Sequence, residues 1–120
     1  MINVIPDWLQ DAIDFLNQEF AEDEDVNVSI LYGFDSVSMD EYGCGFAAYN
    51  TETKSIFLAD YNEIKNSFKE LSWIDVKDTT ITNLFHEYRH HQQNTYGWDL
   101  SEDDAEHFAN HMYAEFISRY

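Results

Sequence analysis

The pattern H-E-x-x-H at residues 86–90 constrains the fold more than any other feature of the chain, because its chemistry requires a helix. Residues four apart lie one above the other on an α-helix, so His86 and His90 can direct two imidazole nitrogens at one zinc ion. Glu87 lies beside them, where its carboxylate can take a proton from a water on that metal. The pattern therefore predicts metal-assisted hydrolysis, with Zn²⁺ as cofactor and Glu87 as general base.

Length and composition favour one small domain. With 120 residues, 44% of them hydrophobic, the chain holds enough apolar material for one core, so a single domain over residues 1–120 is expected. There is no charged leader with a cleavage site and no apolar stretch that could cross a bilayer, which favours a cytoplasmic protein that does not bind membranes. Cys44 is the single cysteine, so any metal must be held by histidine and carboxylate ligands.

The charge of the chain is strongly one-sided. It has 24 acidic residues against 6 basic ones, a formal net charge of −18. This charge repels phosphates, so direct binding to nucleic acid and to anionic membranes is not expected. Solubility is its simplest explanation. The alternatives are attraction of a basic partner or substrate, and imitation of the charge of DNA.

Hydrophobic periodicity predicts an α+β fold, since apolar residues recur at helical spacing in some segments and alternate in others. Pro6 stands where it can open the first helix. The expected elements before the motif are a helix at 7–20, a strand at 26–32, a loop at 34–42, strands at 43–49 and 55–59 joined as a hairpin by 50–54, a helix at 62–71 and a loop at 73–77.

Two capped helices are expected to carry the functional residues. Asp78 or Thr79 can cap the motif helix, and after a turn at 94–99, Ser101 can cap a last helix that runs nearly to the end of the chain. On the motif helix, four apolar side chains fall on the face opposite His86 and His90, as a rotation of 100° per residue requires. They are Ile81, Leu84, Phe85 and Tyr88.

A catalytic zinc ion usually has three protein ligands and a water. The metzincin pattern is excluded, because Gln93 and Tyr96 stand at its glycine and final histidine positions. Glu102 lies on the edge of the apolar stripe of the last helix, where a core-facing carboxylate needs a partner such as zinc. We therefore expect Glu102 to be the third ligand. Glu106 is its competitor, or else a hydrogen-bond acceptor for His86 or His90.

Other polar side chains near the motif receive weaker predictions. His107 and His111 are expected on a solvated helix face rather than at a second metal site, and His91 is expected to be a flanking residue of the same kind. Gln93 shares the face of the two motif histidines, where it could contact a ligand residue or the substrate. Position along the helix is the only basis for these assignments.

The motif and the glutamate helix together resemble the gluzincin zinc metallopeptidases, whose H-E-x-x-H is followed by a helix with a glutamate ligand. The matching residues are His86, Glu87, His90, Glu102, Ala105 and Glu106. Residues 80–109 look more narrowly like the small ImmA/IrrE-type and phage-encoded metallopeptidases. The resemblance implies a minimal zincin-like domain, in which a small sheet with a hairpin packs on the motif helix and an extended substrate aligns along the sheet edge. The short gap between His90 and Glu102, and Glu106 in place of the usual aspartate, leave the ligand open between the two glutamates.

The function expected from these features is hydrolysis of a peptide or protein substrate, with basic substrates favoured by the charge. An oxyanion donor would assist, and the candidates are Tyr88, Tyr96, His91, His111 and Tyr113. The rival class is a non-enzymatic acidic binding protein of phage or mobile-element origin, either a DNA mimic or a metal-containing regulator.

Overall fold

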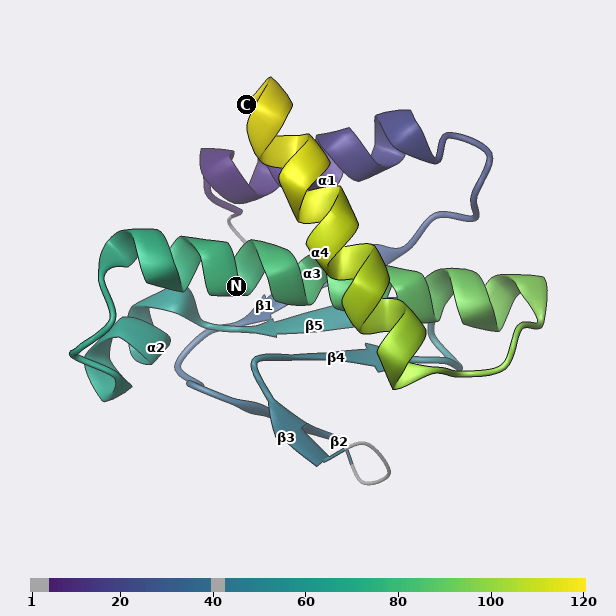
Figure 1. The fold of residues 1–120 in the computed structure, drawn as a ribbon. Coiled ribbons are helices and arrows are strands. Elements are labelled where there is room, and N and C mark those ends of the chain that lie inside the picture. The colour runs from purple at the N-terminus through teal and green to yellow at the C-terminus, as the bar shows by residue number, and fades with distance from the viewer. Residues whose placement is uncertain (1–4, 40–42) are drawn as a thin grey trace.

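The computed structural model describes residues 5–39 and 43–120, and it has the α+β architecture expected from the sequence. The described residues form four helices and a small mixed sheet, and the three longest helices lie on the same side of that sheet (Figure 1). In chain order the elements are α1 (Asp7–Glu19), β1 (Asn27–Leu31), β2 (Val37–Met39), β3 (Gly43–Gly45), β4 (Ala47–Asn50), β5 (Ser55–Ala59), α2 (Tyr61–Ser67), α3 (Trp73–Tyr96) and α4 (Glu102–Arg119).

The main sheet has three strands in the order β1-β5-β4. The central strand β5 pairs in parallel with β1, from Asn27 opposite Ser55 to Leu31 opposite Ala59. It pairs antiparallel with β4, which confirms the predicted hairpin and leaves β4 at one edge of the sheet. Both faces of β5 are covered, and four of its five side chains are buried.

The predicted strand boundaries require two corrections. The segment 34–42, expected to be a loop, contains β2, and the single strand expected at 43–49 is divided into β3 and β4, with Phe46 between them. β2 and β3 form a separate antiparallel pair in which Cys44 lies opposite Ser38. Strands of three residues are too short to produce a recognisable alternation, so periodicity could not reveal them. Residues 40–42 of the predicted loop lie outside the described residues.

Two helix boundaries also differ from the prediction. The motif helix α3 begins at Trp73 rather than after Asp78, because Ser72 and Asp75 form a capping box, with Ser72 Oγ accepting from the Asp75 N–H at 3.1 Å. Trp73 and Ile74 are exposed, so this first turn shows no amphipathic pattern. Helix α2 ends at Ser67, before the predicted Leu71. Ser101 caps α4 as predicted, accepting from the Asp104 N–H at 3.1 Å.

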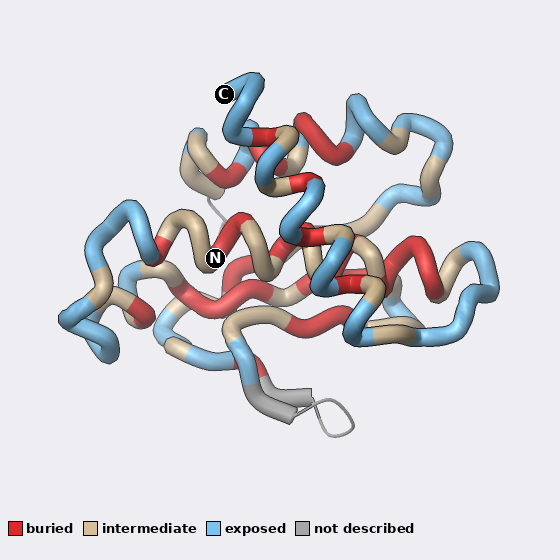
Figure 2. Tube along the Cα trace, viewed as in Figure 1, coloured by how far each residue is buried: buried red, intermediate tan, exposed pale blue. Residues whose placement is uncertain are grey.

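Helix α3 packs against both the sheet and α4, which crosses it steeply (Figure 1). The core-facing residues predicted for α3 are all buried, and Phe85 contacts Phe15 of α1 and Phe116 of α4. Because α3 has neighbours on both faces, burial extends around its C-terminal half (Figure 2). Polar residues are buried there as a result, namely Glu87, His90, His91, Gln92 and Gln93. Among the described residues, no helix is long and apolar enough to cross a membrane.

Candidate metal centre

His86, His90 and Glu102 meet where the first turn of α4 crosses the middle of α3. The two imidazole rings project from successive turns of α3, with centroids 5.0 Å apart. Glu102 Oε2 lies 2.9 Å from His86 Nε2, and Glu102 Oε1 lies 3.0 Å from His90 Nε2. One carboxylate therefore contacts both motif histidines, each through a different oxygen.

These atoms have the chemistry and the spacing of a zinc site. Neutral imidazole nitrogen and carboxylate oxygen are ordinary zinc ligands, and two atoms bound at about 2.0–2.1 Å to one tetrahedral ion are separated by roughly 3.3 Å. The nitrogen-to-oxygen separations of 2.9 and 3.0 Å are slightly shorter than this value. Small movements of exposed Glu102 would therefore suffice to admit an ion, and the residues fit the metal that the motif implies.

The remaining nitrogen of each histidine lies near a side-chain oxygen, and of these two contacts only that of His90 is a hydrogen bond. His86 Nδ1 lies 3.3 Å from Glu106 Oε2, and His90 Nδ1 lies 2.8 Å from Gln93 Oε1. An acceptor at Nδ1 holds the hydrogen on that nitrogen and leaves the Nε2 lone pair available for a metal. Glu106 therefore lies within ion-pair distance of His86 Nδ1 without forming a hydrogen bond to it, whereas Glu102 contacts the Nε2 atoms of both histidines.

Glu87 lies beside this group and is almost enclosed by protein, with 9% of its surface exposed. One oxygen of Glu87 and one nitrogen from each of His86 and His90 all lie within 4.8 Å of one another. Burial raises the pKa of Glu87 to about 7, an effect that neighbouring His90 opposes and the Glu102 carboxylate reinforces. Glu87 is therefore a mostly enclosed carboxylate beside the two motif histidines.

The environment of Glu102 differs from the one predicted. The sequence suggested a carboxylate against the core-facing stripe of the last helix, but the Glu102 side chain is 67% exposed. The core contact of α4 begins one turn later, at Ala105, and continues through Ala109, Met112 and Phe116. Glu102 reaches the histidines because α4 crosses α3 at its first turn, which helix phase alone does not reveal.

His91 is completely buried, which corrects the prediction of a solvated flanking residue. Its Nδ1 lies 2.8 Å from the hydroxyl of Tyr49 on β4, and its Nε2 lies 2.7 Å from the backbone carbonyl of Glu24. Because a carbonyl can only accept, Nε2 carries the hydrogen. His91 thus joins α3 to the edge strand and to the segment before β1. Nothing in the sequence indicated these two contacts of His91, because Tyr49 and Glu24 are distant from it along the chain.

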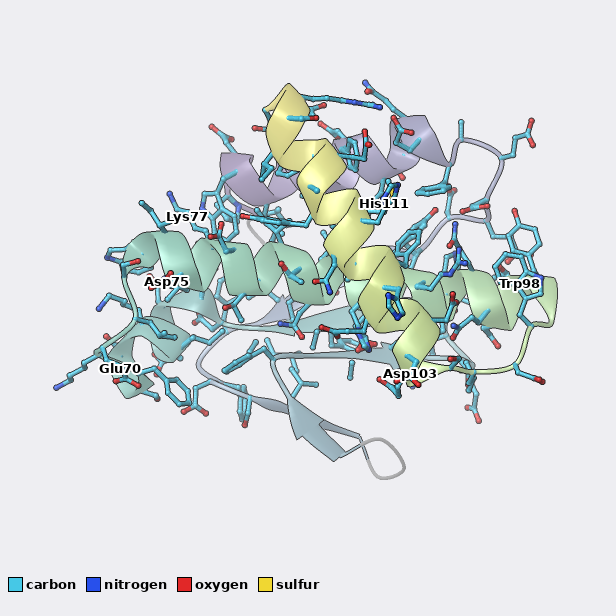
Figure 3. All side chains as sticks on the ribbon, in the orientation of Figure 1. Glu70, Asp75, Lys77, Trp98, Asp103 and His111 are labelled. Carbon is cyan, nitrogen blue, oxygen red and sulfur yellow. The ribbon has the colours of Figure 1, made fainter. Side chains whose placement is uncertain are left out.

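The candidate oxyanion donors are mostly engaged elsewhere. The hydroxyls of Tyr88 and Tyr96 both donate to Asp23, and the hydroxyl of Tyr113 donates to Asp78. His91 is occupied as described above. His107 and His111 are exposed on α4 as predicted, and Figure 3 shows His111 further along α4 than Asp103, which marks its first turn.

No protein-family model, curated protein or solved structure matches this chain. The resemblance to gluzincins consequently depends on the motif residues and on the contacts described here.

Proposed function

We propose that the protein is a zinc-dependent metallopeptidase in which His86, His90 and Glu102 hold the metal and Glu87 is the general base. The observation that carries the proposal is the Glu102 carboxylate, which spans the Nε2 atoms of both motif histidines at 2.9 and 3.0 Å. The burial of Glu87 beside them adds a group that can move a proton. A structural role for the two histidines alone would not require a carboxylate between them.

The chain's own residues divide the chemistry between them. A bound zinc ion supplies a more acidic water and a Lewis acid for the scissile carbonyl. Glu87 would accept the proton of the attacking water on its carboxylate and donate it to the leaving amine, and its enclosure would exclude bulk water from that transfer. In the part of the chain that the structure describes, edge strand β4 has one side without a strand partner in the main sheet, and the backbone of an extended peptide could pair there.

The net charge of −18 bears on the substrate and also favours a second candidate function. Basic, unstructured peptides would be attracted at low ionic strength, so they are the first substrates to test. The same charge suits an acidic binding protein that occupies a basic, DNA-binding partner. Such a protein would need neither Glu87 nor a metal.

The decisive experiment compares wild type with Glu87→Gln, using Glu70→Gln as control because it removes one exposed carboxylate far from the motif (Figure 3). We expect about one zinc per chain in all three proteins. Cleavage of basic peptides should fall by about 100-fold or more in Glu87→Gln alone, the usual contribution of a positioned proton-transfer group. If the wild type cleaves nothing but binds a DNA-binding protein equally well with and without zinc, the binding protein replaces the peptidase.

A further inference from the structure

Gln93 is the most completely hydrogen-bonded side chain near the candidate metal centre, and only 1% of its surface is exposed. It lies on α3, three residues after His90. Its Oε1 is 2.8 Å from His90 Nδ1 and 3.3 Å from the backbone nitrogen of Ser101. Its Nε2 donates to the Ser101 carbonyl at 3.2 Å and to Asp104 Oδ2 at 2.9 Å. One side chain therefore contacts a candidate ligand and the start of α4.

The partners of Gln93 determine the orientation of its amide. The Ser101 N–H can only donate, so it must face Oε1, and the Ser101 carbonyl can only accept, so it must face Nε2. With Oε1 fixed in this direction, the nitrogen of His90 that faces it must carry a hydrogen. The lone pair of a neutral His90 would thereby be placed on Nε2, 3.0 Å from a Glu102 oxygen, and a bound cation would bridge these two acceptors.

Gln93 also fixes the position of the helix that carries Glu102. Ser101, which it binds through both backbone groups, is the N-cap of α4 and directly precedes Glu102. Asp104 is bound from a second side by Arg89, whose Nε donates to Asp104 Oδ2 at 2.8 Å. The start of α4 is therefore attached to α3 by hydrogen bonds from two side chains, Gln93 and Arg89.

We propose that Gln93 is the positioning residue of this centre, which selects the metal-binding nitrogen of His90 and holds Glu102 opposite it. The proposal rests on the zinc site proposed above. It deepens that site, because one buried amide would set both the tautomer of one ligand and the placement of another. Residues in this role typically change metal affinity by about 10- to 100-fold when removed.

Gln92 provides a matched control for removing Gln93. It is the adjacent glutamine, it is 3% exposed, and its hydrogen bonds go to Asp23 and Arg89 instead. We expect Gln93→Leu to weaken zinc binding by about 10- to 100-fold relative to wild type, whereas Gln92→Leu should remain within about threefold. Affinity would be measured by competition with a chromophoric chelator, after urea denaturation has shown that both variants fold.

A second readout follows the ring of His90 directly and needs neither metal nor substrate. In metal-free protein that carries Glu102→Ala, which removes the carboxylate facing Nε2, ¹⁵N NMR in mildly alkaline buffer should show the Nδ1–H tautomer of His90 with Gln93 intact or with Gln92→Leu, and its loss with Gln93→Leu.

The two readouts separate this inference from the peptidase proposal. If the protein binds zinc and cleaves no peptide while the tautomer still depends on Gln93, the peptidase fails and the positioning role stands. If the protein takes up no zinc, both proposals fail. If Gln93→Leu keeps the wild-type tautomer, or matches Gln92→Leu in zinc affinity where zinc binds, the positioning role is overturned.

Discussion

Glu102 and Glu106 form a natural pair for deciding which carboxylate binds the metal. They lie one turn apart on α4, and their side chains are 67% and 65% exposed, so replacing either by alanine creates no buried cavity. Each variant should therefore keep the wild-type free energy of unfolding to within about 1 kcal/mol, the scale of a charge near a helix N-terminus. Any larger effect on zinc can then be assigned to the metal centre itself.

The contacts predict unequal losses of zinc affinity. Glu102 faces the Nε2 atoms of both histidines, whereas Glu106 faces only His86 Nδ1, at 3.3 Å. Removing a carboxylate that lies beside a ligand's other nitrogen should weaken binding by no more than about 10- to 100-fold, which is about 1.4–2.8 kcal/mol. Removing Glu102 eliminates a ligand, so Glu102→Ala should lose considerably more than 100-fold.

The assay is competitive titration of zinc against a chelator of known affinity, with urea denaturation of the metal-free proteins as the control for folding. The assignment is refuted if Glu102→Ala retains tight zinc while Glu106→Ala loses it. Equal, modest losses in both variants would also refute it, because they would show that neither glutamate is a ligand.

Three further predictions concern the scaffold. Burial raises the pKa of Asp23, but hydrogen bonds from three donors on α3 lower this pKa overall. The contribution of ionised Asp23 to the stability of the folded protein should therefore be full above the unfolded pKa of about 3.9, and it should disappear as the pH falls through the lower folded pKa. In urea denaturation, Asp23→Asn should therefore be less stable than wild type at pH 7, with the difference shrinking toward about pH 2; a constant difference would contradict the linkage. His91→Ala should cost at least about 1–3 kcal/mol, because it leaves buried partners unsatisfied, whereas exposed His107→Ala should cost almost nothing. Ser72→Ala should cost about 1 kcal/mol because it removes the capping box at the start of α3, and an unchanged free energy of unfolding would contradict a helix start at this residue.

The local part of this structure follows from the sequence. The spacing of His86 and His90 places both rings on one face of a helix, because a helical turn has a fixed period. The apolar stripes of α1 and α3, the hairpin before α2 and the Ser101 cap likewise depend on neighbours within a few residues. Such features are encoded by short-range sterics and hydrogen bonding, so one sequence is sufficient to predict them.

The contacts between distant segments were decided only by tertiary packing. The steep crossing of α4 over α3 brings exposed Glu102 to the two histidines and buries Gln93 between the helices. The sheet and the segment before β1 bury His91 and give it Tyr49 and the Glu24 carbonyl as partners. Periodicity reports which face of a helix is apolar, but the partner of each polar side chain depends on how two elements meet in space. For that reason the sequence could name the two histidines, Glu87, Glu102 and Gln93 as candidates, while the atoms through which Glu102 and Gln93 contact the histidines emerged from the fold.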